Sequence, residues 1–66
     1  MEPKYPEIEV QLTGEDSNAF SIMGRVTKAM RKAKVPSDEI TKFTEECMRG
    51  DYNNLLQTCT EWVTCE

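Results

Sequence analysis

The stretch EIEVQLTGEDSNAFSIMGRVTKAMRKA, residues 7–33, contains the change of pattern that decides the fold. Over residues 7–12, apolar and polar residues alternate strictly, which is typical of a half-buried β-strand. From Ala19 onward, apolar residues recur every three or four positions, as they do on one face of an α-helix. The stretch therefore predicts a strand that is followed, after a short turn, by an amphipathic helix.

Gly14 lies in the turn between the predicted strand and the predicted helix. A phosphate-binding loop needs several glycines and usually a lysine, so that backbone amides can surround the anion. Here a single glycine is followed by Glu15 and Asp16, whose charges repel phosphate. We therefore interpret Gly14 as a turn residue with a positive φ angle. Asp16, Ser17 and Asn18 are each suited to cap the first turn of the helix.

Three helices are predicted, the first over residues 19–33. Gly24 lies inside it and costs about 1 kcal/mol relative to alanine, so we expect another element to pack closely there. Ser37 is expected to be the N-cap of the second helix, and Gly50 to end it. Asp51 is expected to cap the third helix.

This order of elements predicts an α+β fold, mostly helical, in a single domain over residues 1–66, with residues 1–6 as an extended arm. A lone strand leaves a row of backbone groups unpaired. Two partners are open for it: a short C-terminal strand over residues 63–65, or the same strand of a second chain. The predicted core comprises Ile8, Val10, Leu12, Phe20, Met23, Val26, Met30, Ile40, Phe43, Leu55, Leu56 and Trp62.

Charge is distributed unevenly along the chain. The net charge is -4, yet five of the 8 basic residues lie between positions 25 and 34, where no acidic residue occurs. Four of them are expected on the side of the first helix opposite its apolar residues, and we call this set the basic face: Arg25, Lys28, Arg31 and Lys32. Its structural interpretation is a solvated surface that balances the acidic helices. Its functional interpretation is a contact surface for an acidic protein or for nucleic-acid phosphates.

Catalytic and metal-binding constellations are missing from the sequence. It contains no histidine, and its 3 cysteines (Cys47, Cys59 and Cys65) form no CxxC pair, so the usual zinc sites lack ligands. The acidic pairs are sequence neighbours at positions suited to helix caps or solvated faces: Glu15/Asp16, Asp38/Glu39 and Glu45/Glu46. We predict a protein that is not an enzyme and holds no cofactor or metal. Cys47 and Cys59 are expected to be buried.

The expected location is the cytoplasm. Free thiols suit a reducing compartment, and the N-terminal residues contain no apolar signal core. No apolar run approaches the roughly 18 residues of a membrane span, so we expect no membrane contact.

Several short motifs are distributed over nearly the whole chain. They are Gly14, Asn18-Ala19-Phe20, Gly24-Arg25-Val26, Gly50-Asp51-Tyr52, Leu55-Leu56 and Trp62-Val63. This pattern resembles a family of small proteins from bacteria and their mobile elements that has no assigned function. The resemblance implies a recurring small fold of bacterial or phage origin, and it transfers no catalytic residue.

Two functions follow as hypotheses. The first is a small interaction or accessory protein that uses the basic face to bind another protein. The alternative is a DNA-binding dimer of the ribbon-helix-helix type, because a strand followed by two helices is the order of that motif. Its outward residues would be Glu7, Glu9 and Gln11, and two carboxylates match a phosphate-lined groove poorly. Nucleic acid is therefore the less favoured partner, and the chain is expected to be a monomer or a homodimer.

Overall fold

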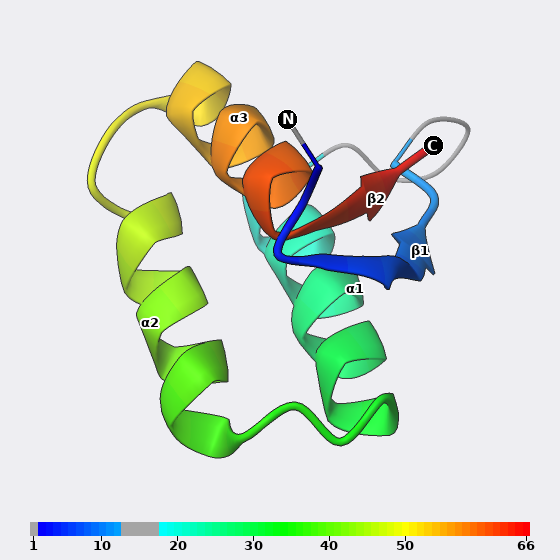
Figure 1. Ribbon diagram of the computed structural model, residues 1–66. Coiled ribbons are helices and arrows are strands. Elements are labelled where there is room, and N and C mark those ends of the chain that lie inside the picture. The colour runs from blue at the N-terminus through cyan, green and yellow to red at the C-terminus, as the bar shows by residue number, and fades with distance from the viewer. Residues whose placement is uncertain (1, 13–17) are drawn as a thin grey trace.

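The computed structural model describes residues 2–12 and 18–66. Its elements in chain order are β1 (Tyr5–Val10), α1 (Ala19–Lys32), α2 (Ser37–Cys47), α3 (Tyr52–Trp62) and β2 (Val63–Cys65). The predicted α+β, mostly helical fold is confirmed. Figure 1 shows α1 and α2 as an antiparallel pair, with the two strands on the side of the molecule away from α2.

The two strands come from opposite ends of the chain and form a parallel pair. Val10 is the register partner of Cys65, and the backbone N–H of Glu66 donates to the Val10 carbonyl at 2.8 Å. Parallel strands need a long crossover connection, and here the three helices supply it. The partner of the N-terminal strand is therefore the C-terminal strand of the same chain, the first of the two expected options.

The first strand begins two residues earlier than predicted. The prediction of an extended arm over residues 1–6 is therefore wrong for residues 5 and 6, which belong to the strand. Tyr5 and Pro6 belong to β1 because contacts with the C-terminal part of the chain hold them there. The Tyr5 ring stacks on Trp62 with 6.1 Å between centroids, and the Thr64 hydroxyl donates to the Pro6 carbonyl at 2.8 Å. Leu12, which was predicted in the strand, lies beyond the end of β1. Its N–H still donates a hydrogen bond to the Glu66 carbonyl.

The N-cap residues predicted from the sequence are confirmed for two of the three helices. Asn18 caps α1, and the Asp51 side chain caps α3 by accepting the backbone N–H of Asn54 at 3.0 Å. The prediction for α2 is wrong, because Pro36 is the N-cap residue and Ser37 is already helical. The fixed φ of proline suits this position, and Pro36 makes no side-chain capping bond.

The connection from α1 to α2 is closed by a hydrogen-bonded turn of the Schellman type. Lys34 has a φ of 65°, in the left-handed region, and its N–H bonds to the Arg31 carbonyl at 3.0 Å. The Val35 N–H bonds to the Met30 carbonyl at the same distance. Val35 and Met30 are both buried, which supplies the apolar contact that accompanies this motif. The turn directs the chain back along α1 as α2.

The two glycines within the described residues have opposite surroundings. Apart from its chain neighbours and the nearby backbone of α1, no atom lies within 4 Å of an ideal Cβ at Gly24, so the expected close packing is wrong. A Cβ at Gly50 would lie 2.9 Å from the Cβ of Asn54, so Gly50 permits the close approach of the α2–α3 connection to α3. The helix before it ends earlier than predicted, at Cys47. The prediction for Gly14 falls outside the described residues.

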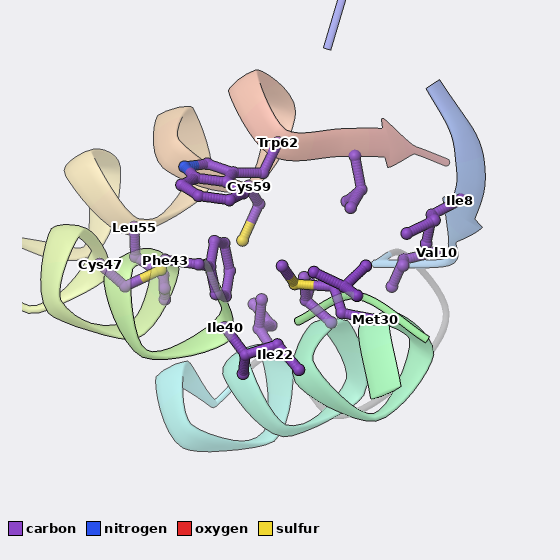
Figure 2. Close-up of a cluster of buried hydrophobic side chains, with 13 residues drawn as sticks. Ile8, Val10, Ile22, Met30, Ile40, Phe43, Cys47, Leu55, Cys59 and Trp62 are labelled. Atoms are coloured by element: carbon purple, nitrogen blue, oxygen red, sulfur yellow. The ribbon is translucent and has the colours of Figure 1, made fainter. Parts of the chain in front are cut away.

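The core lies between the helices and the sheet (Figure 2). At its centre, the fully buried ring of Phe43 meets Trp62 edge-on, with 5.7 Å between centroids and 72° between planes. Eight of the predicted core residues are buried: Ile8, Val10, Val26, Met30, Ile40, Phe43, Leu55 and Trp62. Three are partly buried against them: Leu12, Met23 and Leu56.

Phe20 is the clear error in the predicted core, because 74% of its surface is exposed. It lies one residue past Ala19 in the first turn of α1, which turns its side chain about 100° away from the buried stripe. Five further residues of the core are buried, of which only Cys47 and Cys59 were predicted to be so: Ile22, Val35, Cys47, Cys59 and Val63.

Candidate functional site

The basic face lies on the outer side of α1, opposite the buried Ile22 and Val26. Lys28, Arg31 and Lys32 are exposed. Helical spacing explains this arrangement, because each of these cations is out of phase with the buried stripe. The exposed Lys34 extends the same charge just beyond the helix.

Arg25 differs from the other members of the basic face. It is half-buried, and its guanidinium donates a hydrogen bond to the Gln11 carbonyl at 2.9 Å. This bond ties α1 to the segment that follows β1. Arg25 therefore has a structural role within the chain, while the remaining three members face solvent.

The exposed members of the basic face have no carboxylate partner within the described residues. In that part of the chain, Lys4 Nζ forms an ion pair with Glu39 Oε1 at 2.6 Å, and this pair lies away from the basic face. The acidic side chains of the described residues therefore do not neutralise Lys28, Arg31 and Lys32 by direct contact. Their charges remain available to a ligand of opposite sign.

An apolar groove adjoins the start of α1, and its opening is rimmed by exposed side chains. Phe20, Met48 and Tyr52 expose 74%, 64% and 42% of their surfaces. The groove has a volume of about 300 Å³. We call it the apolar groove, and its lining comprises Ala19, Phe20, Met23, Cys47, Met48, Gly50, Asp51, Tyr52 and Leu55. Monomeric proteins seldom leave large apolar side chains clustered on the surface without a function.

The groove is built from the ends of three helices. Phe20 lies in the first turn of α1, Met48 is the C-cap residue of α2, and Tyr52 begins α3. Phe20 is far in sequence from Met48 and Tyr52, so no local pattern reveals their cluster. The one local signal is the offset of Phe20 from the apolar stripe of its helix.

The groove and the basic face share one side of α1. Phe20, Gly24, Lys28 and Arg31 follow one another at spacings of four, four and three residues, which places them along a single stripe of the helix. Gly24 is exposed. The stripe therefore runs from an apolar end, over bare backbone, to a cationic end.

Two of the acidic residues considered as catalysts have structural partners. Glu39 accepts hydrogen bonds from Lys4 and from the Tyr5 hydroxyl, and Glu46 accepts the Trp62 indole N–H at 3.0 Å. Asp38 and Glu45 are exposed, and Glu15 and Asp16 lie outside the described residues. The described acids therefore act as contacts between elements or lie in solvent.

The cysteines are free thiols. Cys47 and Cys59 are buried as predicted, and Cys65 is half-buried. The hydrogen bond that the Cys59 thiol donates to Cys47, together with burial, raises the pKa of Cys59. Burial raises the pKa of Cys65 to about 11. Because the thiolate is the reactive form, these two thiols are poorly suited to nucleophilic chemistry near neutral pH. Across residues 2–12 and 18–66, no group of three or more potential ligands could hold a metal ion.

Comparisons with known proteins add no family to these observations. No protein-family model, no curated protein and no solved structure matches the chain. The resemblance to small bacterial and phage proteins therefore stays a prediction. Among the helices of the described residues, none has both the length and the apolar character needed to cross a membrane.

Proposed function

We propose that the protein is a small interaction or accessory protein, without enzymatic activity, that binds an acidic partner protein through the basic face of α1. The observation that carries the proposal is the exposure of Lys28, Arg31 and Lys32 without ion-pair partners in the described part of the chain. Such a cationic surface on a chain with a net charge of -4 favours ligands of opposite sign. A cytoplasmic location belongs to the proposal and is supported by the free thiols.

The test compares two charge reversals that change the net charge equally. Lys28→Glu alters the middle of the basic face, whereas Lys42→Glu alters an exposed lysine of α2. Each variant is immobilised beside the parent chain, and the proteins retained from a lysate of the source cells are quantified at two salt concentrations. We expect Lys28→Glu to lose specific acidic proteins that Lys42→Glu retains, with weaker retention at high salt. Equal retention by both variants would contradict the proposal.

The ribbon-helix-helix alternative gains no support from the strand. That motif pairs the N-terminal strands of two chains, whereas β1 pairs in parallel with β2 of its own chain. We expect no retention of the protein on duplex DNA at low salt. Salt-sensitive retention that is lost on changing Gln11 would favour the alternative.

A further inference from the structure

The apolar groove is open to a ligand, and its size limits what that ligand is. Its volume of about 300 Å³ lies at the small end of the range for sites that enclose small molecules. Phe20 and Met48 on its rim are mostly exposed, so the groove does not enclose its contents. A site of this size and openness fits one or two large apolar side chains of a protein segment better than a free metabolite.

Gly24 lies next to the groove and has no role in the packing of its own chain. A helix-interior glycine lowers stability relative to alanine, and an alanine methyl group at this position would meet no atom within 4 Å other than those of its chain neighbours and the nearby backbone of α1. The Gly24 carbonyl accepts a hydrogen bond from the Thr27 hydroxyl, which any residue would allow. What the missing side chain does provide is bare helix backbone between Phe20 and Lys28, where another backbone can approach closely.

We infer that the apolar groove and the basic face together bind one acidic amphipathic helix of a partner protein. An apolar side chain of that helix fills the groove, its backbone passes over Gly24, and its carboxylates meet Lys28 and Arg31. The distance from Phe20 to Arg31 along α1 is about 16 Å, which three turns of a partner helix span. Helices commonly bind in this manner, with apolar anchors on one face. The inference rests on the proposed function and names the form of the partner.

Charge favours an acidic partner over a second copy of the chain. An antiparallel two-fold contact through this stripe would set the cationic end of each copy, Lys28 and Arg31, against the apolar end of the other copy's stripe. Residues 25–34 contain no acidic residue that could pair there with the cations of a second copy. Like charges across an interface oppose association, whereas carboxylates opposite Lys28 and Arg31 support it.

The probe is a displayed library of 18-residue helical peptides with randomised surface positions, selected on the immobilised full chain. We expect the enriched peptides to combine large apolar residues at helical spacing with several Asp or Glu residues. Their affinity is then measured for the parent chain and for four variants, each first checked for folding by circular dichroism.

Two variants test the groove and the bare backbone. Phe20→Ser is expected to weaken binding at least about tenfold, because an exposed aromatic anchor is lost. Gly24→Ala is expected to weaken binding about tenfold while raising the thermal stability of the chain, since alanine favours the helix. The control is Thr41→Ala on the exposed side of α2, which also raises helix propensity and should leave binding unchanged.

The outcomes separate this inference from the proposed function. Suppose that Lys28→Glu weakens the binding of acidic peptides while Phe20→Ser and Gly24→Ala leave it unchanged. This result would overturn the inference but not the proposed function. Enriched peptides without acidic bias whose binding is unchanged by Lys28→Glu would overturn both. No enrichment would overturn the inference alone, because the proposed function does not require the partner segment to be a helix.

Two further measurements test other occupants of the same stripe. Binding of a single-stranded oligothymidine that is lost in Phe20→Ser would overturn the inference in favour of base stacking. If the parent chain is a dimer in solution and Phe20→Ser makes it a monomer, the inference is overturned in favour of a second copy as the occupant. Absence of both results, together with the expected peptide binding, supports it.

Discussion

Phe20 and Phe43 are the two phenylalanines of the chain, and their surroundings are opposite. Phe43 is completely buried and meets the edge of Trp62, while Phe20 exposes 74% of its surface beside the apolar groove. The difference comes from their positions around their helices rather than from residue type. Phe43 faces the core from α2, whereas Phe20 lies on the outer side of the first turn of α1.

Replacing each phenylalanine by alanine should separate these roles. Phe43→Ala is expected to cost about 3–5 kcal/mol, which would leave so small a domain largely unfolded. Phe20→Ala should change the free energy of unfolding by less than about 0.5 kcal/mol, as surface substitutions usually do. Urea unfolding followed by circular dichroism measures both. A similar loss in the two variants would contradict the exposure of Phe20.

Lys34 holds a strained backbone conformation at the end of α1. Its φ of 65° is easily adopted by glycine but costs a residue with a Cβ. Lys34→Gly should therefore raise the free energy of unfolding by about 1 kcal/mol. Thermal unfolding of the variant beside the parent chain gives the answer, and a lower melting temperature would show that the turn is not left-handed.

Several contacts from β1 to the helices hold the start of the strand in place. Lys4 lies over the Trp62 ring at 4.4 Å from its centroid, and it pairs with Glu39 of α2. The Tyr5 ring stacks on Trp62 while its hydroxyl donates to Glu39. The strand is thus attached to both α2 and α3, and the attachment includes a titratable carboxylate.

Stability should depend on pH through Glu39. The hydrogen bond from Lys4 holds the pKa of Glu39 below its usual value of 4.5. A lowered carboxyl pKa adds stability that is fully present above the unfolded value and is lost as pH falls through the folded one. As the pH falls below 4.5, the melting temperature of the parent chain should therefore decrease more than that of the Glu39→Gln variant. Parallel acid titrations test this, and identical curves would rule out the contribution.

The sequence allowed prediction of the elements better than of their limits. The alternation over residues 7–12 identified a strand, and the capping residues Asn18 and Asp51 were visible as such. The start of β1 at Tyr5 could not be predicted, because proline at the next position argues against a strand. Contacts with Trp62 and Thr64, at the other end of the chain, override that local signal.

At the scale of the whole molecule, the two ends of the chain meet in one sheet, which packs against α1 and α3 (Figure 1). The basic face could be predicted because it depends on the spacing within one helix. The apolar groove could not, since it forms only where the ends of α1, α2 and α3 come together. Half of the candidate site was therefore visible in the sequence, and the other half is a product of the fold.

Pairing of β1 with β2 in the same chain predicts a monomer. Light scattering behind a sizing column, with reductant, should give a mass near 7.6 kDa at low and at high concentration. No strand from a second chain is needed to satisfy the backbone of β1 on its paired side. A stable dimer at both concentrations would contradict this expectation.

Binding along one side of α1 is tested most directly by a nuclear magnetic resonance titration. The ¹⁵N-labelled full chain is titrated with the tightest acidic peptide from the displayed library, and shifts of the backbone amides are recorded. We predict shifts that follow Phe20, Gly24, Lys28 and Arg31 and extend to Met48. Shifts centred instead on the outer side of α2 or on the sheet would contradict a binding surface on α1.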